Sequence, residues 1–214
     1  TYQALESVKT EDGNKLSILE KNIDYLPEGD LLIKVSYSSL NYKDAMSASG
    51  MPGVTRNYPH TPGIDAVGDI QQTSDKDFKE GDKLIVTCYD LGMNTAGGFG
   101  QYIRVPSTWA TPLPDGLSEI ESMSLGTAGL TAGLSVNALD LFRGNKGFEG
   151  TKSIVTGSTG GVGSIALMLL TKLNSEVTAV TGKETQKELK NGLGASEVIL
   201  REDLEEIARK PIGK

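Results

Sequence analysis

The feature that most limits the fold of this chain is a glycine-rich turn between an apolar strand and a helix. Residues 153–156 read Ser-Ile-Val-Thr and lead directly into Gly-Ser-Thr-Gly-Gly-Val-Gly at residues 157–163. After the turn, apolar side chains recur with the spacing of one helical face, at Val162, Ile165, Ala166, Leu169 and Leu170. Residues 177–180 and 197–200 predict two further strands, and residues 184–190 predict the helix between them. This order favours a parallel α/β sheet with right-handed crossovers.

The turn matches the dinucleotide-binding fingerprint G-x-G-x-x-G at its second and third glycines, Gly160 and Gly163, while Ser158 stands at the first. The second glycine lets the backbone approach a pyrophosphate, and the third lets the helix pack against the strand. Free N–H groups at the helix start attract phosphate. The fingerprint predicts a dinucleotide at Ser158, Thr159, Gly160, Gly161, Val162 and Gly163. The alternative is a glycine-rich turn without a ligand.

The end of the second strand bears on which nicotinamide would bind. An NAD site has a carboxylate there for the ribose hydroxyls, whereas this strand ends Thr181-Gly182-Lys183. A hydroxyl and a cation suit a 2′-phosphate, so we expect NADPH. Two alternatives stay open: Glu184 serves as the ribose acid, or Lys183 is an ordinary solvated lysine.

The first part of the chain has a different pattern of predicted secondary structure. Short strands with turns between them are predicted at 31–35, 66–70, 83–87 and 99–105, which suggests a small β-rich domain, partly closed as a barrel. After Pro114, helices are predicted at 119–125 and 127–141.

Composition excludes several classes of function. The net charge of -7 argues against non-specific nucleic-acid binding. No apolar run approaches the roughly 20 residues of a membrane span. Cys88 is the only cysteine, which excludes an internal disulfide and a cysteine-based zinc site. We expect a cytoplasmic protein that acts on a small molecule.

Taken together, the motifs resemble those of the medium-chain dehydrogenase/reductase superfamily, and within it the YhdH/YhfP group of quinone oxidoreductases and acryloyl-CoA reductases. The matching strings, in the family's order, are residues 38–44, 58–68, 97–102, 126–132 and 156–163. The resemblance implies a GroES-like β-barrel domain, assigned to residues 1–122. It is followed by the N-terminal half of an α/β Rossmann-type domain, assigned to residues 123–214. In the family that sheet has six strands. Because the chain ends soon after the third, we expect a fragment or a sequence that omits later residues.

The resemblance also implies that no zinc is bound. The family's three catalytic zinc-ligand positions fall at Asn41, at Ile64 and near Gly126 or Thr127, and none of these side chains is a zinc ligand. His60 is the only histidine, and we expect it at the surface or in a capping role.

Without a Lewis-acid metal, reduction of an electron-poor double bond is favoured over alcohol oxidation. The resemblance implies NADPH-dependent hydride transfer to an α,β-unsaturated acyl-CoA such as acryloyl-CoA. It places Tyr42, Asn41 and Lys43 at the reaction, adds Tyr42, Thr127 and Thr131 to the cofactor residues, and implies a homodimer for the full-length protein. From residue types alone, the polar quartet of residues 41–44 also fits an ordinary loop. An NADPH:quinone oxidoreductase and a non-catalytic NADPH-binding protein remain alternatives.

Overall fold

The computed structural model describes residues 1–182 and 186–204. The chain forms two compact units, Thr1–Thr127 and Ala128–Lys214, so the division falls just after the boundary expected between residues 122 and 123.

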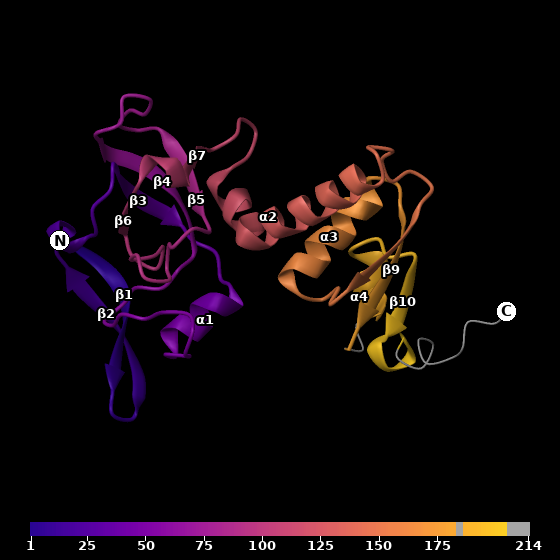
Figure 1. Cartoon of the computed structure of the whole chain (residues 1–214), viewed down its shortest axis with the longest axis horizontal. Helices are drawn as coiled ribbons and strands as arrows, with labels where there is room; N and C mark the ends of the chain where they lie inside the picture. The colour runs from indigo at the N-terminus through magenta and orange to yellow at the C-terminus, as the bar shows by residue number, and fades with distance from the viewer. Residues whose placement is uncertain (183–185, 205–214) are drawn as a thin grey trace. The chain divides into compact units, whose positions relative to one another are not determined.

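The first unit contains an open antiparallel sheet of five strands in the order β6-β3-β4-β5-β7 (Figure 1). Its strands are β3 (Leu31–Tyr37), β4 (Asp65–Thr73), β5 (Lys83–Thr87), β6 (Tyr102–Val105) and β7 (Ala110–Pro112). A separate hairpin pairs β1 (Tyr2–Thr10) with β2 (Gly13–Lys21). Short helices complete the unit: η1 (Ile23–Tyr25), α1 (Tyr42–Ala48) and η2 (Ser107–Trp109). The predicted strands at 31–35, 66–70 and 83–87 are confirmed, and the one at 99–105 is shorter than predicted.

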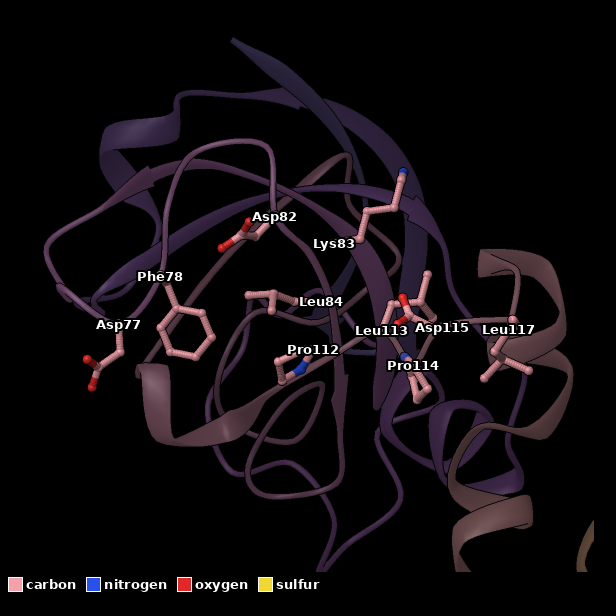
Figure 2. A pocket seen from close by; sticks show the side chains of 11 residues that line it. Asp77, Phe78, Asp82, Lys83, Leu84, Pro112, Leu113, Pro114, Asp115 and Leu117 are labelled. Carbon is pink, nitrogen blue, oxygen red and sulfur yellow. The ribbon is translucent and has the colours of Figure 1, made fainter.

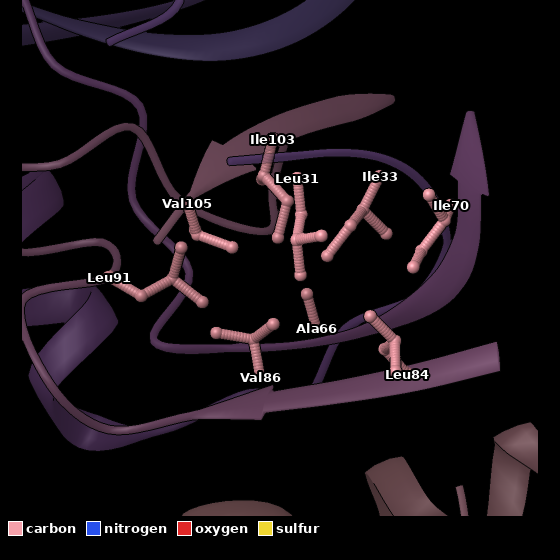
Figure 3. Packing of buried hydrophobic residues seen from close by; sticks show 9 residues of the cluster. All are labelled: Leu31, Ile33, Ala66, Ile70, Leu84, Val86, Leu91, Ile103 and Val105. Atoms are coloured by element: carbon pink, nitrogen blue, oxygen red, sulfur yellow. The ribbon is translucent and has the colours of Figure 1, made fainter. Parts of the chain in front are cut away.

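The main core of the first unit lies on one face of this sheet. Leu84 and Val86 alternate along β5, as expected for a strand with one buried face, whereas β3 is buried on both faces. Leu31 and Ile33 of β3 belong to the main cluster, and Leu32 packs in a second cluster with Tyr2, Ala4 and Leu26. Figure 3 shows the side chains of the main cluster from β3 and β5 converging with those of Ala66, Ile70, Leu91, Ile103 and Val105. Full burial of one such aliphatic side chain stabilises the fold by about 1.5–3 kcal/mol.

Helix α2 (Glu119–Phe142) begins in the first unit and ends in the second. Gly126 interrupts it with φ 49° and ψ -151°, a conformation that glycine adopts without strain. The two predicted helices at 119–125 and 127–141 are therefore confirmed, with the break at the residue between them.

The second unit is the predicted parallel α/β unit. Its sheet has the order β10-β9-β8, formed by β8 (Lys152–Thr156), β9 (Glu176–Thr181) and β10 (Glu197–Leu200). Helix α3 (Gly161–Lys172) joins β8 to β9, and α4 (Gln186–Asn191) lies between β9 and β10. Leu167 and Leu170 of α3 pack in one cluster with Val155 of β8 and Val177 and Ala179 of β9. Because the strands are parallel, the segments that follow all three leave the sheet at the same edge.

Within the described ranges 1–182 and 186–204, no helix is both long enough and apolar enough to span a bilayer.

Candidate functional site

The turn after β8 is built around Gly157 and Ser158. Gly157 has φ 63°, which turns the chain sharply off the strand. Ser158 is fully buried: its Oγ donates to the carbonyl of Val155 at 2.6 Å and accepts from the N–H of Val180 at 3.1 Å. The Ser158 hydroxyl therefore joins β8 to β9, and the Ser158 N–H also donates to the carbonyl of Val180, at 3.2 Å.

The glycines of the turn differ in the space around them. A Cβ on Gly163 would stand 2.2 Å from the carbonyl oxygen of Gly157, so helix α3 packs directly against the turn. A Cβ on Gly160 would meet only that same oxygen, at 3.3 Å. The first-turn N–H groups of α3, on Gly161, Val162 and Gly163, have no preceding helical carbonyl to bond. The exposed turn thus offers N–H donors and the positive end of a helix dipole, and it fits a pyrophosphate.

The other predicted cofactor residues of the second unit lie nearby or outside the described part. Thr159 and Gly182 are exposed, whereas Thr181 is only 2% exposed. Lys183 and the alternative acid Glu184 fall outside the described residues. Thr131 is exposed on α2, about one turn beyond Ala128, which a Cβ on Gly161 would meet at 3.3 Å.

In the first unit, the polar quartet begins helix α1 and is not a loop. Asn41 is the N-cap, and its N–H donates to Asp44 Oδ2 at 2.8 Å. Asp44 Oδ1 accepts from the N–H of Ile64 at 2.9 Å, which ties the helix start to the 62–65 segment. Burial raises the pKa of the Asp44 carboxyl, while these N–H donors oppose the rise. Tyr42 and Lys43 stand exposed on the first helical turn; the Tyr42 ring is 79% exposed.

The main polar feature beside α1 is the carboxylate of Asp65, which is fully buried. It accepts hydrogen bonds from Ser39 Oγ, from Asn41 Nδ2 at 2.9 Å, and from both the N–H (2.9 Å) and the Oγ1 (2.7 Å) of Thr127. No ion pair among the described residues involves Asp65. Hydrogen bonds to a charged acceptor are stronger than neutral ones, and these offset the cost of burying the charge.

This network connects two of the three positions where the superfamily places zinc ligands. Asp65 bridges Asn41 and Thr127, and Ile64 precedes it in the chain. Asn41 Nδ2 also donates to Ser39 Oγ at 2.8 Å, so both amide N–H groups are used. Within the described residues, no group of three His, Cys, Asp or Glu side chains is arranged to hold a metal. No local sequence pattern indicates the partners of Asp65, because they lie 24 to 62 residues away.

His60, expected at the surface or in a capping role, is buried. It is 4% exposed, and its Nε2 has no hydrogen-bond partner within the described part of the chain. Burial lowers the pKa of His60, with a hydrogen bond to the Gly92 backbone opposing the shift.

A surface pocket of about 510 Å³ lies elsewhere in the first unit (Figure 2). Phe78, Leu84 and Pro112 surround it, and Lys83 at its rim forms ion pairs with Asp69 (2.9 Å) and Glu119 (3.1 Å). None of the predicted site residues lines this pocket, so its size alone gives it no functional role.

Comparison with known proteins agrees with this architecture. The alcohol dehydrogenase GroES-like domain family matches residues 27–115. The chain is 41% identical over its whole length to YhfP of Bacillus subtilis, which carries a quinone oxidoreductase name, and 37% identical over 99% of its length to the acrylyl-CoA reductase AcuI of Ruegeria pomeroyi. It spans 64% of the length of each relative.

Solved structures show the same likeness. The chain superposes on Escherichia coli YhdH with bound NADPH at a TM-score of 0.90 and 38% identity, covering 99% of this chain and 64% of that one. The YhfP crystal structure, which has NAD bound, gives a TM-score of 0.91, with 100% of this chain and 64% of that one covered. The order of motifs, the two units and these likenesses agree: residues 27–115 match the GroES-like domain of alcohol dehydrogenases, and the whole chain is similar to the YhdH and YhfP proteins.

Proposed function

We propose that the protein is a zinc-independent, NADPH-dependent oxidoreductase that reduces an α,β-unsaturated acyl-CoA such as acryloyl-CoA. The observation that carries the proposal is the turn after β8. There Gly163 packs on Gly157, and Gly160 lies beside the first-turn N–H groups of α3, which no preceding helical carbonyl can accept from. AcuI is named as an acrylyl-CoA reductase, and the YhdH structure holds NADPH. The name of AcuI supports the choice of substrate, and the NADPH bound to YhdH supports the choice of cofactor.

The backbone of residues 158–163 would bind the pyrophosphate, and Thr181, Gly182 and Lys183 would surround the 2′-phosphate. The family resemblance adds Tyr42, Thr127 and Thr131. When bound, the cofactor supplies the hydride that an electron-poor double bond accepts at its β-carbon.

The chain's own residues would then handle the thioester oxygen and the proton. As negative charge develops on that oxygen, a hydrogen-bond donor stabilises it, and a proton must reach the α-carbon. The exposed Tyr42 hydroxyl is suited to either task, and the exposed Lys43 ammonium next to it in sequence would hold a ribose of the cofactor. Asn41 has both N–H groups engaged, so we assign it to holding the α1 start in place.

Zinc independence rests on the Asp65 network. A carboxylate that accepts from Asn41 and Thr127 holds together two segments that a metal would otherwise link. We therefore expect activity to survive dialysis against EDTA.

The test measures NADPH oxidation by the protein with acryloyl-CoA, with 1,4-benzoquinone, and with NADH in place of NADPH. Fast oxidation with the thioester and little with NADH supports the proposal. Turnover with the quinone alone favours a quinone oxidoreductase, the alternative that the name of YhfP supports. Tight NADPH binding without turnover on either acceptor indicates a non-catalytic binding protein.

We further propose that the full-length protein is a cytoplasmic homodimer with small-molecule substrates and no nucleic-acid or membrane partner. Sedimentation velocity of the full-length protein at several concentrations tests the dimer.

A further inference from the structure

A polar pocket of about 460 Å³ lies in the first unit, between the hairpin of β1 and β2 and the segment that follows α1. The hairpin contributes Lys9 and Asn14, and the segment contributes Arg56 and Tyr58. Among the described residues that line the pocket, none carries a carboxylate. Its wall is therefore positively charged, although the chain as a whole has a net charge of -7.

Hydrogen bonds hold the walls of this pocket in place. The Tyr58 hydroxyl donates to the carbonyl of Ser47 at 2.7 Å, which ties the 50–58 segment back to α1. Asn14 Nδ2 donates to Ser7 Oγ at 2.8 Å, and that hydroxyl donates to the carbonyl of Ala48 at 2.8 Å. The hairpin, the end of α1 and the segment after it thus form one frame for the two cations.

Both cations are available to an anion. Lys9 and Arg56 are exposed, and across residues 1–182 and 186–204 neither takes part in an ion pair. The hairpin turn carries Glu11 and Asp12, but neither of them lines the pocket. A guanidinium binds phosphate oxygens in a bidentate manner, and an ammonium binds them as a point charge. The pair suits a ligand with more than one phosphate group.

Helix α1 connects this pocket to the proposed reaction. Tyr42, which we place at the thioester, begins α1, whereas the Ser47 and Ala48 carbonyls that anchor the pocket walls lie at its end. A helix of seven residues is about 10 Å long. An acyl-CoA carries its phosphates beyond a flexible pantetheine arm that is longer than this helix. Its thioester can therefore lie at Tyr42 while its phosphates lie in the pocket.

We propose that this pocket binds the phosphate groups of the CoA part of the substrate, with Arg56 and Lys9 as the phosphate-binding residues. The inference rests on the proposed function and deepens it, because it names the part of the chain that distinguishes a CoA thioester from a quinone, which has no phosphate. These phosphates are separate from those of NADPH, for which the turn after β8 is proposed.

The test compares acryloyl-CoA with acryloyl-pantetheine, which has the same thioester and no phosphate. The variants Arg56→Met and Lys9→Met each remove one charge from the pocket. The matched control is Lys15→Met, on the same hairpin. Lys15 is exposed and follows Asn14 along β2, so its side chain points to the opposite face of the hairpin. KM and kcat are measured for both thioesters and for NADPH. Titration calorimetry with CoA at low salt measures binding without turnover, and circular dichroism checks the fold.

We expect Arg56→Met and Lys9→Met each to raise the KM for acryloyl-CoA about 10-fold, because each loses a charge-assisted contact to phosphate. The rise should be absent with acryloyl-pantetheine and with NADPH, and Lys15→Met should match the wild type with every substrate. Affinity for CoA itself should fall about 10-fold in the two pocket variants alone.

Two results would overturn the inference while the proposed function stands: the same KM for acryloyl-CoA in Arg56→Met and Lys15→Met, or an equal rise with both thioesters. If the wild type reduces neither thioester, the proposed function fails and calorimetry decides the pocket separately. Weaker CoA binding in Arg56→Met than in Lys15→Met then supports the pocket, and equal binding in the two variants overturns it.

Discussion

Replacing Gly163 by alanine would put a methyl carbon 2.2 Å from the carbonyl oxygen of Gly157, 2.7 Å from its carbonyl carbon and 3.1 Å from the Cα of Ser158. All three are backbone atoms, so no side-chain rotation relieves the overlap. Helix α3 would have to move by about 1 Å to restore ordinary van der Waals distances. Its buried Leu167 and Leu170 would move with it, out of the cluster they share with β8 and β9.

Overpacking that shifts a buried helix costs about 1–3 kcal/mol, and we expect the upper end here because the overlap is with backbone. Gly160→Ala is the matched control, since its methyl would meet only the Gly157 oxygen, at 3.3 Å. It should change stability by less than about 1 kcal/mol and weaken NADPH binding, because the second glycine of the fingerprint gives the backbone its close approach to the pyrophosphate.

The assay is urea denaturation followed by far-ultraviolet circular dichroism, with NADPH affinity measured in parallel. Gly163→Ala should lower the free energy of unfolding by several times as much as Gly160→Ala. Equal stabilities for Gly163→Ala and the wild type would refute the steric argument. So would a Gly160→Ala protein as unstable as Gly163→Ala.

Three further predictions concern the first unit. Asp65→Ala leaves the donors of Asn41 and Thr127 without their acceptor and should cost about 3–5 kcal/mol in urea denaturation, whereas an unaltered midpoint would show that the network carries little stability. Burial lowers the pKa of His60 below its ordinary value of 6.5, so the unfolded chain binds the proton more tightly. The stability that the neutral His60 side chain contributes is present above pH 6.5 and is lost as the pH falls below that value. The drop in urea midpoint between pH 7.5 and pH 5 should therefore be smaller in His60→Gln than in the wild type. An equal drop in both proteins would contradict this prediction. Tyr42→Phe should lower kcat with acryloyl-CoA about 100-fold while NADPH affinity changes little, and unchanged turnover would remove Tyr42 as the proton donor.

The second unit could be predicted from local signals. The Gly157–Gly163 turn, the helical spacing after it and the apolar strands at 177–180 and 197–200 each act over a few residues, and the structure contains the elements they predicted. Gly126 marked the break in α2 for the same reason, since glycine readily adopts a positive φ.

The first unit was harder because its signals are weak or distant. Strand β2 is mostly exposed, so its sequence lacks the alternation that reveals a half-buried strand. Helix α1 was missed because it is short and opens with residues typical of turns. Neither the burial of His60 nor the Asp65 network has a local signature, because the contacts join segments far apart in the sequence.

The strand order of the first unit has a consequence for the order in which the chain can fold during synthesis. Strand β3 pairs with β4, about thirty residues later, and also with β6, where Leu31 faces Val105. The N–H of Leu5 in the first hairpin donates to the carbonyl of Phe99. The apolar side chains of β3 therefore stay uncovered until residues far downstream have been translated. In the second unit, by contrast, each pairing joins strands that are adjacent along the chain. Slow closure of this kind is the stage at which a nascent chain most needs protection from aggregation, and here it falls on the first unit.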